Sequence, residues 1–433
     1  MKLFLFLISI SFVIPGFTSL EASPSKREKK KQEKQRTINW LAQYQTARMG
    51  AEYFKQENLT GKGIRIAVFD AGFKGVDKHP AFDHIRENIV ATYDFTKNSE
   101  NVYRKHWHGT AVLSNIAGKM GDIPLGLAPE AEFLLVTIEN PTPSVLGFGR
   151  TLEENWIRAI EWAHQNGANI ITASLGYNII YLPENMDGQT SLVSKVTKLA
   201  AEKGILLINS AGNSGTKNDK FKVITTPADA DHVLTVGGID PKTEVRSGFS
   251  SYGPSADGRL KPNVTASSIT VAARQSKRDS FRIVSGTSFS TPLVAGFAAC
   301  VWQAHPHLKA AEIFKLIEQS SELYPYYVYA PGYGVPNARY FDENTPKPSK
   351  FFDFVEENDT IRVEISKDIL PQLEKSTIFR LYYHLQKPNG MLSEYAVIDV
   401  FQKTALIFPK EKLEGIKQIS VHFLGYTQTY EIE

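Results

Sequence analysis

Three short polar segments, far apart in the chain, each stand where an apolar run meets a turn. Asp70-Ala71-Gly72 closes an alternating apolar run, His108-Gly109-Thr110 opens a segment with helical spacing, and residues 285–292 (SGTSFSTP) directly precede the apolar run 293–302. Functional side chains of an open α/β sheet gather beyond the carboxyl ends of its strands. We therefore expect an α/β fold that brings these three segments to one edge of a sheet.

Asp70 follows a run in which Ile64, Ile66 and Val68 alternate with other residues, a pattern that predicts a buried strand. A carboxylate at this strand end, followed by the permissive Gly72, can reach a partner from another segment. The alternative is an aspartate that only forms a turn or caps a helix.

His108 opens a segment in which Val112, Leu113 and Ile116 recur at helical spacing, so its imidazole is predicted near a helix start. An imidazole held by a carboxylate is the general base that a serine nucleophile needs, because a free hydroxyl is hardly ionised at neutral pH. The alternative is a metal site shared with His106, which lacks the third protein ligand that zinc normally recruits.

Ser288 precedes the apolar run 293–302, which predicts a helix buried nearly all round with Ser288 at or near its N-terminus. Pro292 fits the first turn, and the amides and dipole of a helix start favour negative charge. Asn213 follows the apolar strand 205–208, and its neutral amide can stabilise charge on an oxygen. The alternatives are a serine that only caps a core helix and an Asn-Ser turn without a role.

The order Asp, His, Ser, with the stretches between these residues, resembles the subtilisin-like serine proteases, the subtilase family. The resemblance spans about residues 50–340 and implies a mostly parallel sheet with helices on both faces. It implies that Asp70 orients His108, which takes the proton of Ser288. It also implies that Asn213 and the backbone amide of Ser288 stabilise the oxyanion. The substrate groove is expected to be lined by Ser174, Leu175, Gly176, Ala211 and Gly212.

Three sites depart from the family pattern. Ala71 stands where the family commonly has Thr or Ser, Asn263 ends a Lys-Pro-Asn segment where Lys-Pro-Asp is usual, and Ser267-Ser268 replaces Pro-Gly. These changes alter loops and supporting contacts but leave the four chemical groups intact. The chemistry requires no cofactor, and no metal ligand is assigned. The resemblance implies structural calcium, although no acidic loop has a spacing that identifies its site.

Residues 1–23 are predicted to be a secretory signal peptide, with cleavage somewhere between 19 and 23. Lys2 precedes an apolar run over residues 3–14, which is shorter than the roughly twenty residues of a spanning helix. We therefore expect an exported protein, secreted or periplasmic. The alternative is an uncleaved N-terminal membrane anchor.

Residues 24–49 are predicted to be a basic linker or short prosegment. Residues 26–36 carry seven basic and two acidic side chains, whereas the whole chain has a formal net charge of +3. The remainder is near neutral, so we expect no nucleic-acid partner and membrane contact only through this basic segment. The segment is too short for the folded propeptide of most secreted subtilases, which leaves the activation route open.

The rest of the chain divides into a catalytic domain at 50–342, a linker at 343–349 and a β-rich domain at 350–433. Alternating runs at 360–365 and 418–423 and the hairpin signal Pro388-Asn389-Gly390 predict a small antiparallel sandwich in this last domain. Cys300 is the single cysteine, which excludes an intramolecular disulfide, and its apolar surroundings predict a buried, inert thiol. We expect a monomer.

The leading interpretation is an exported serine endopeptidase that hydrolyses peptide bonds of protein or peptide substrates through an acyl-enzyme intermediate. The alternative is a catalytically silent subtilase fold that acts as a binding or processing partner, which the short prosegment and Ala71 favour. An esterase that uses the same Asp, His and Ser is a third interpretation.

Overall fold

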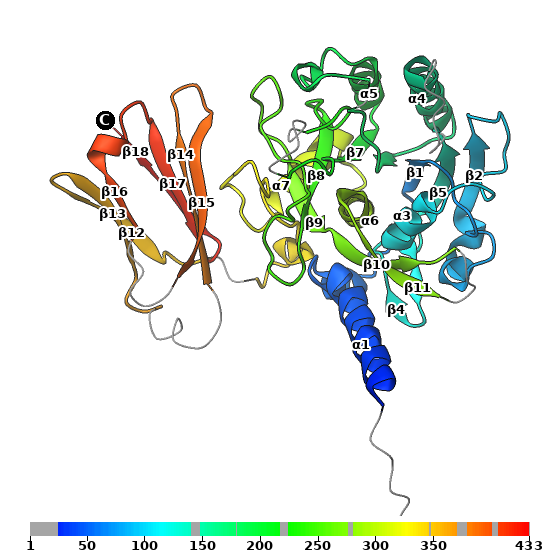
Figure 1. Cartoon of the computed structure of the whole chain (residues 1–433), viewed down its shortest axis with the longest axis horizontal. Helices are drawn as coiled ribbons and strands as arrows, with labels where there is room; N and C mark the ends of the chain where they lie inside the picture. The colour runs from blue at the N-terminus through cyan, green and yellow to red at the C-terminus, as the bar shows by residue number, and fades with distance from the viewer. Residues whose placement is uncertain are drawn as a thin grey trace, which may run out of the picture.

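The computed structural model describes residues 25–139, 148–178, 180–216, 224–275, 280–345, 348–369, 379–400 and 406–432, without the side chains of 148–150. The predicted signal peptide at 1–23 lies outside these residues. Over the described ranges, no helix is both long and apolar enough to span a bilayer. Figure 1 shows a larger α/β part, with elements from Lys26 to Phe341, and a smaller all-β part that ends in the C-terminus.

The α/β part is built on a seven-stranded sheet with the order β2-β5-β1-β6-β7-β8-β9, in which all neighbouring strands run parallel. Its strands are β1 (Arg65–Asp70), β2 (Ile89–Asp94), β5 (Glu132–Thr137), β6 (Ile170–Ala173), β7 (Leu206–Ser210), β8 (Val233–Ile239) and β9 (Val264–Ser267). Two short antiparallel pairs are β3 (Lys119–Met120) with β4 (Ile123–Pro124), and β10 (Ile269–Ala273) with β11 (Phe281–Ser285).

Helices cover both faces of this sheet (Figure 1). The α-helices of this part are α2 (Ala51–Gln56), α3 (His108–Ala117), α4 (Phe148–Gln165), α5 (Leu192–Glu202), α6 (Thr287–Ala304) and α7 (Ala310–Gln319). Short 3₁₀ helices are η1 (Pro80–Asn88), η2 (Pro183–Asn185) and η3 (Ala338–Phe341).

Strand β1 shows why helices must cover both faces of the sheet. Ile66 and Val68 belong to the core that includes α3 and α6, whereas Ala67 and Phe69 belong to the core that includes α4 and α5. Successive side chains of a strand point to opposite faces, so a strand that is apolar throughout is buried on both. The predicted α/β fold, with a mostly parallel sheet and helices on both faces, is confirmed.

Helix α6 is the centre of the larger core, because every residue from Thr287 to Trp302 is buried. Cys300 lies on this helix, has no exposed surface, and donates to the carbonyl of Leu127 (3.2 Å). Burial raises the pKa of the Cys300 thiol, which favours its protonated form. The predicted burial of the thiol is confirmed, and its lack of reactivity stays a prediction.

Most of the segment predicted to be a basic linker or short prosegment, 24–49, forms helix α1 (Lys26–Ala47). Ser25 caps this helix through a capping box with Glu28. Its charged first half is exposed and projects from the domain (Figure 1). Its second half packs on the α/β part through Ile38, Leu41 and Ala42.

Gln45 fixes that second half of α1. Its amide donates to the carbonyl of Leu125 (2.6 Å) and to Asn115 Oδ1 (3.0 Å), and its Oε1 accepts from the Val271 amide (2.8 Å). Gln45 is buried. Gln45 and the apolar residues of the second half thus anchor α1, whose first half has no apolar face.

The C-terminal part is an antiparallel sandwich of two sheets, as the sequence predicts. One sheet has the order β12-β13-β16 and the other β15-β14-β17-β18. The elements are β12 (Phe352–Glu357), β13 (Thr360–Ile365), β14 (Phe379–Gln386), β15 (Leu392–Val400), β16 (Leu406–Pro409), η4 (Lys410–Lys412), β17 (Gln418–Phe423) and β18 (Tyr426–Glu431). Pro388-Asn389-Gly390 joins β14 and β15, with Gly390 at a positive φ of 84°.

An aromatic cluster joins the sandwich to the α/β part. Tyr326, from the loop before η3, stacks on His384 of β14 with ring centroids 4.7 Å apart and lies 5.8 Å from the ring of His422. Tyr329 Oη also accepts from the Leu392 amide (3.4 Å). These buried rings make the contact between the two parts apolar and specific.

Candidate active site

The parallel order of the sheet places Asp70 at the carboxyl end of β1, between β5 and β6. Asp70 is fully buried, and its Oδ1 accepts a hydrogen bond from the Ala71 amide (2.7 Å). His108 is the first residue of α3, and its Nδ1 faces both carboxylate oxygens of Asp70 at 3.0 and 2.9 Å. The structure thus brings together an acid and a base that are far apart in the sequence.

Glycine permits this close approach. Gly109 donates its amide to the carbonyl of Gly72 (3.1 Å), so the start of α3 rests on the turn after β1. A Cβ built on Gly109 would lie 2.6 Å from that carbonyl oxygen, a distance that real Cβ atoms do not show. The glycines of the Asp and His segments therefore let the two backbones touch.

The charge around His108 favours its protonated form. Burial opposes protonation, but the charge and hydrogen bond of Asp70, with a smaller contribution from Glu139, outweigh it and raise the pKa of His108 above its ordinary value. A base held in this way accepts a proton readily and stabilises the imidazolium that results.

Glu139 is a residue that sequence reasoning missed. It follows β5, where Thr137 lies opposite Asp70 in the register of β1 and β5. It is hydrogen-bonded to Tyr177, which in turn accepts from Trp156 Nε1 (2.8 Å). Burial and the nearby charge of Asp70 raise the pKa of Glu139 to about 7. The only signal in the sequence is a single glutamate beyond an apolar strand, which is too weak to identify.

Ser288 is the second residue of α6 and is buried, with 8 % of its surface exposed. The helix begins after Gly286, whose φ of 144° lies in a region that favours glycine. Phe289 packs against the His108 ring, with centroids 5.6 Å apart. The start of α6 therefore lies beside the Asp70 and His108 pair.

The hydroxyl of Ser288 donates to the carbonyl of Ser174 at 3.3 Å. The hydroxyl of Ser174 donates in return to the carbonyl of Ser288 at 2.8 Å. Among the described residues, no hydrogen bond joins the Ser288 hydroxyl to His108. Catalytic hydrogen bonds are often long or misaligned before substrate binds.

Asn213 lies against the same helix start. Its Oδ1 accepts from the Thr287 amide (2.9 Å) and from the Thr287 hydroxyl (3.1 Å). With the oxygen held, the amide nitrogen of the same group remains as a donor, and the Asn213 residue is exposed. The structure therefore places a neutral hydrogen-bond donor beside the helix start that holds Ser288, and its role at an oxyanion stays a prediction.

The two segments expected to line the groove also meet at α6. Ser174 is tied to Ser288, and the carbonyl of Gly212 accepts from the Thr287 hydroxyl (3.2 Å). The residues of these segments are Ser174, Leu175 and Gly176 after β6, and Ala211 and Gly212 after β7. All five lie at the carboxyl edge of the sheet, near the start of α6.

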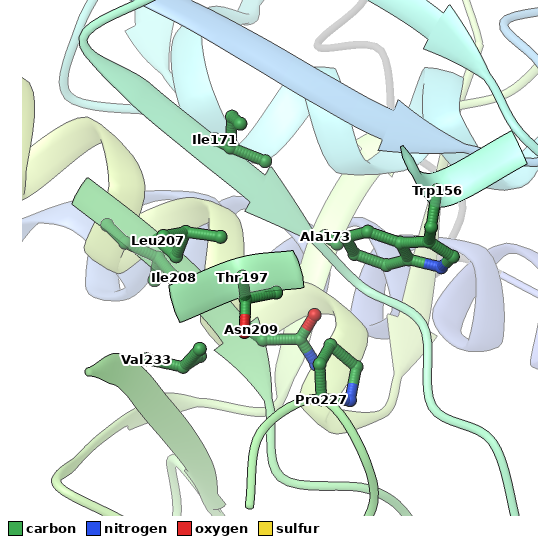
Figure 2. Close-up of a pocket in the computed structure, with 9 residues that line it drawn as sticks. All are labelled: Trp156, Ile171, Ala173, Thr197, Leu207, Ile208, Asn209, Pro227 and Val233. Atoms are coloured by element: carbon green, nitrogen blue, oxygen red, sulfur yellow. The ribbon is translucent and has the colours of Figure 1, made fainter. Parts of the chain in front are cut away.

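Asn209 of β7 holds the segment 174–176 by a hydrogen bond. Its amide donates to the carbonyl of Leu175 (2.9 Å), which joins β7 to the residues that follow β6. Figure 2 shows Asn209 beside Pro227, with Ala173 and Trp156 nearby, around a cavity of about 10 Å³. A cavity of this size holds at most one water, so it is a packing gap and not the substrate site.

Among the described residues, no group of three or more His, Cys, Asp or Glu side chains is placed to hold a metal ion. His106 lies beside His108, with ring centroids 6.3 Å apart, but the Nδ1 of His108 is occupied by Asp70. The contacts of His108 thus favour a base over a metal ligand. Structural calcium remains a prediction.

A parallel α/β sheet whose carboxyl edge carries an aspartate, a histidine and a helix-start serine is the architecture of a serine hydrolase. A family profile described as "Subtilase family" matches residues 61–349 of the chain. The chain belongs to the subtilase family and is a subtilisin-like serine protease by class.

The comparison with known proteins gives the degree of similarity. The chain is 29 % identical to Subtilisin BL of Lederbergia lenta over 269 residues, which cover 62 % of this chain and 86 % of that protein. It is 28 % identical to Serine protease AprX of Bacillus subtilis over 295 residues, which cover 61 % of this chain and 63 % of AprX. These matches leave more than a third of the chain without a counterpart.

Solved structures agree on the fold. The chain resembles a structure titled "S41 Psychrophilic Protease" with a TM-score of 0.52 and 24 % identity, over 64 % of this chain and 92 % of that one. It resembles a cold adapted subtilisin-like serine proteinase with a TM-score of 0.50 and 24 % identity, over 65 % of this chain and 89 % of that one.

Proposed function

We propose that the protein is an exported serine endopeptidase that cleaves protein or peptide substrates through an acyl-enzyme intermediate. The observation that carries the proposal is the contact of His108 Nδ1 with both oxygens of the buried Asp70, beside the helix start that holds Ser288. Asn213, fixed through its oxygen on Thr287, supports the same reaction, because its free amide can donate to a developing oxyanion.

The reaction would proceed in two halves. The Oγ of Ser288 forms a bond to the carbonyl carbon of the substrate while its proton passes to Nε2 of His108, and Asp70 stabilises the imidazolium. The carbonyl oxygen, now negative, accepts hydrogen bonds from Asn213 and from a backbone amide at the start of α6. The carbon–nitrogen bond then breaks, and the leaving amine takes the proton from His108.

Water completes the cycle. A water molecule gives a proton to Nε2 of His108 and attacks the ester on Ser288, and the same donors stabilise the second oxyanion. The ester bond breaks, Ser288 recovers its proton, and the carboxylic acid product leaves. Every step uses groups that the chain supplies, and the balance requires only water and the peptide.

Export is part of the proposal and rests on the apolar run at residues 3–14, which has the length of the apolar region of a signal peptide. The chain should be expressed with its own N-terminus in a host that exports proteins. Sequencing the N-terminus of the purified protein reports whether and where processing occurs. Recovery of an unprocessed, membrane-bound chain would instead support the alternative of an N-terminal anchor.

The chemistry is tested on the purified protein beside Ser288→Ala. We expect a fluorophosphonate probe to label the wild type, and peptide amides to be cleaved, with both signals lost in Ser288→Ala. A folded wild type that neither labels nor cleaves would support the silent binding fold instead. Turnover of esters without any amide cleavage would support the esterase interpretation.

A further inference from the structure

Arg282 carries a charge that has no anionic partner in the part of the chain that the structure describes. It lies on β11, and its guanidinium carbon is 3.5 Å from the centroid of the Trp107 ring. Its Nε and Nη2 atoms are buried, and neither has a hydrogen-bond acceptor among the described residues. Burial and the charge of a second cation, Arg274, lower the pKa of Arg282. A buried, charged donor without an acceptor is costly.

The two unpaired atoms form an edge of the guanidinium that suits a carboxylate. The N–H bonds of Nε and Nη2 point to the same side, and such an edge matches carboxylate oxygens. Elsewhere in the chain this edge is occupied, because Arg65 donates to Glu132 Oε2 through Nε (2.8 Å) and Nη2 (2.6 Å). A carboxylate is therefore the group that would complete the contacts of Arg282.

Trp107 holds the guanidinium in place. The Trp107 ring packs against a small apolar cluster, whose members are Ala111, Ala272, Val284 and Phe289. Val284 and Arg282 are two residues apart on β11, so their side chains lie on the same face of the strand. Arg282 and Trp107 are both partly exposed. A guanidinium over a ring face can turn in its own plane and keep that contact, which presents the unpaired edge to a ligand.

This pair lies beside His108, the proposed base. Trp107 directly precedes His108, and the two rings meet edge to face with centroids 5.7 Å apart. Burial, followed by the charges of His108 and Arg282, lowers the pKa of His106, and the Arg282 charge also opposes the raised pKa of His108. The guanidinium is thus within electrostatic reach of the reacting groups.

The pair also lies toward the side where the leaving group departs. The leaving amine takes its proton from His108, so the residues after the cleaved bond pass this histidine and its neighbours. The segments expected to line the groove follow β6 and β7, whereas Trp107 precedes α3 and Arg282 lies on the separate β10-β11 pair. In Figure 1 this pair lies below α3 and α6, and β7 lies above them. Two extended residues span about 7 Å, enough to pass from His108 to the neighbouring Trp107 ring.

We propose that Arg282, stacked on Trp107, binds a carboxylate on the leaving side of the substrate. This carboxylate is an Asp or Glu side chain within the first two residues after the cleaved bond, or the C-terminal carboxylate of a substrate that ends there. The inference rests on the proposed protease function. It adds a substrate class and the residue that selects it.

The experiment uses peptides with one common acyl half and a leaving half that varies in charge. One arm places Glu or Gln at the first or second residue after the cleaved bond, with an amidated C-terminus. The other arm keeps Gln and compares a free C-terminal carboxylate with the amide. We expect the wild type to cleave a carboxylate peptide about 10-fold faster, in kcat/KM, than its neutral counterpart, the lower end for a charge-assisted hydrogen bond. The arm that shows the preference identifies the source of the carboxylate.

Three variants test whether Arg282 causes the preference. Arg282→Gln should bring the ratio of charged to neutral peptide close to one. Arg282→Lys keeps the charge but loses the planar fork, so an intermediate ratio is expected. Arg274→Gln is the matched control, because it removes an exposed cation nearby and should keep most of the preference. Fluorophosphonate labelling counts the active sites of each preparation, which separates a loss of folding from a loss of preference.

Two results would overturn the inference and leave the protease function intact. The first is a labelled wild type that prefers neither carboxylate. The second is a ratio that persists in Arg282→Gln, or that falls equally in Arg274→Gln and so belongs to the general positive charge of this region. Absence of labelling in the folded wild type is a distinct result, because it rejects the proposed protease function and this inference with it.

Discussion

Pro292 explains why Ser174 is bonded to Ser288. In an α-helix the carbonyl of residue 288 accepts from the amide of residue 292, but proline has no amide hydrogen and its ring pushes that carbonyl aside. The Ser174 hydroxyl supplies the missing donor at 2.8 Å. The bond therefore satisfies a buried carbonyl and also fixes the groove segment to the residue that carries the nucleophile.

Ser174→Ala should destabilise the protein because it leaves the Ser288 carbonyl buried without a donor. Ser174 and Ser288 are 5 % and 8 % exposed, so water cannot replace the hydroxyl easily, and the expected cost is about 1–3 kcal/mol. For a large domain each kcal/mol lowers Tm by about 2–4 °C. Thermal unfolding followed by calorimetry measures this shift.

The double variant tests the physical reason. In a Pro292→Ala background the restored amide of residue 292 can donate to Ser288, so Ser174→Ala should cost only about 0.5–1.5 kcal/mol, the net value of one hydrogen bond. Ser290→Ala, whose lost hydroxyl bonds to the Ser267 carbonyl (3.2 Å), should cost the same in both backgrounds. A Ser174→Ala cost that differs between backgrounds by less than about 0.5 kcal/mol, the usual additivity error, would refute the reasoning.

Three further predictions follow from the site and the sandwich. Glu139→Gln removes a group that favours protonated His108 when it is ionised; because the pKa of Glu139 is itself raised to about 7, it is only partly charged where His108 titrates, so the acid limb of the kcat/KM profile should move only slightly to lower pH, as a pH-rate series would show. Asn213→Ala should lower kcat about 100- to 1000-fold with little change in KM, the loss known for this type of donor in subtilisin; steady-state kinetics decides. Burial lowers the pKa of His384 and His422 to about 4, below the unfolded value of about 6.5. Stability of the sandwich should therefore be full above pH 6.5 and fall as the pH drops toward 4, measured by Tm against pH, whereas a His384→Phe variant should lose part of this dependence.

The predicted site residues come from features that act locally. Asp70 ends a short apolar run, and such a run predicts a strand. Ser288 precedes an unbroken apolar run, and such a run forms a core helix. Asp70 lies at the carboxyl edge of the parallel sheet. Ser288 instead follows β11 of the separate β10-β11 pair, so its place beside His108 depends on the packing of α6. The sequence indicated the local setting of each residue, and the tertiary packing brings them together.

Other residues depend on contacts between distant segments. Glu139 lies near Asp70 because β5 pairs with β1, and the sequence of either strand alone does not predict this pairing. Arg282 belongs to no motif, and its position over Trp107 is visible only in the structure. Helix α1 was missed because its first half is charged and has no apolar periodicity. The contacts that hold its second half, such as the hydrogen bond from Gln45 to the Leu125 carbonyl, are tertiary and become visible only in the structure.

At the departures from the family pattern, the hydrogen bonds to Asp70 and around Asn263 are made by other groups. Ala71 has no hydroxyl to orient Asp70, but its backbone amide donates to the carboxylate at 2.7 Å. At the Lys-Pro-Asn segment, the buried Lys261 donates to Asn263 Oδ1 (3.1 Å), and Asn263 donates through its nitrogen to Glu318 (2.8 Å).

An aspartate at 263 could accept from Lys261 but would repel Glu318, whose pKa is already raised by burial. Asparagine is the residue that can accept from an ammonium and donate to a carboxylate at once. The acidic group that contacts Asn263 in this cluster lies on α7, at Glu318. A missing motif residue is consequently weak grounds for inferring a silent enzyme, because its hydrogen bonds can be supplied by the backbone or by a helix that the motif does not include.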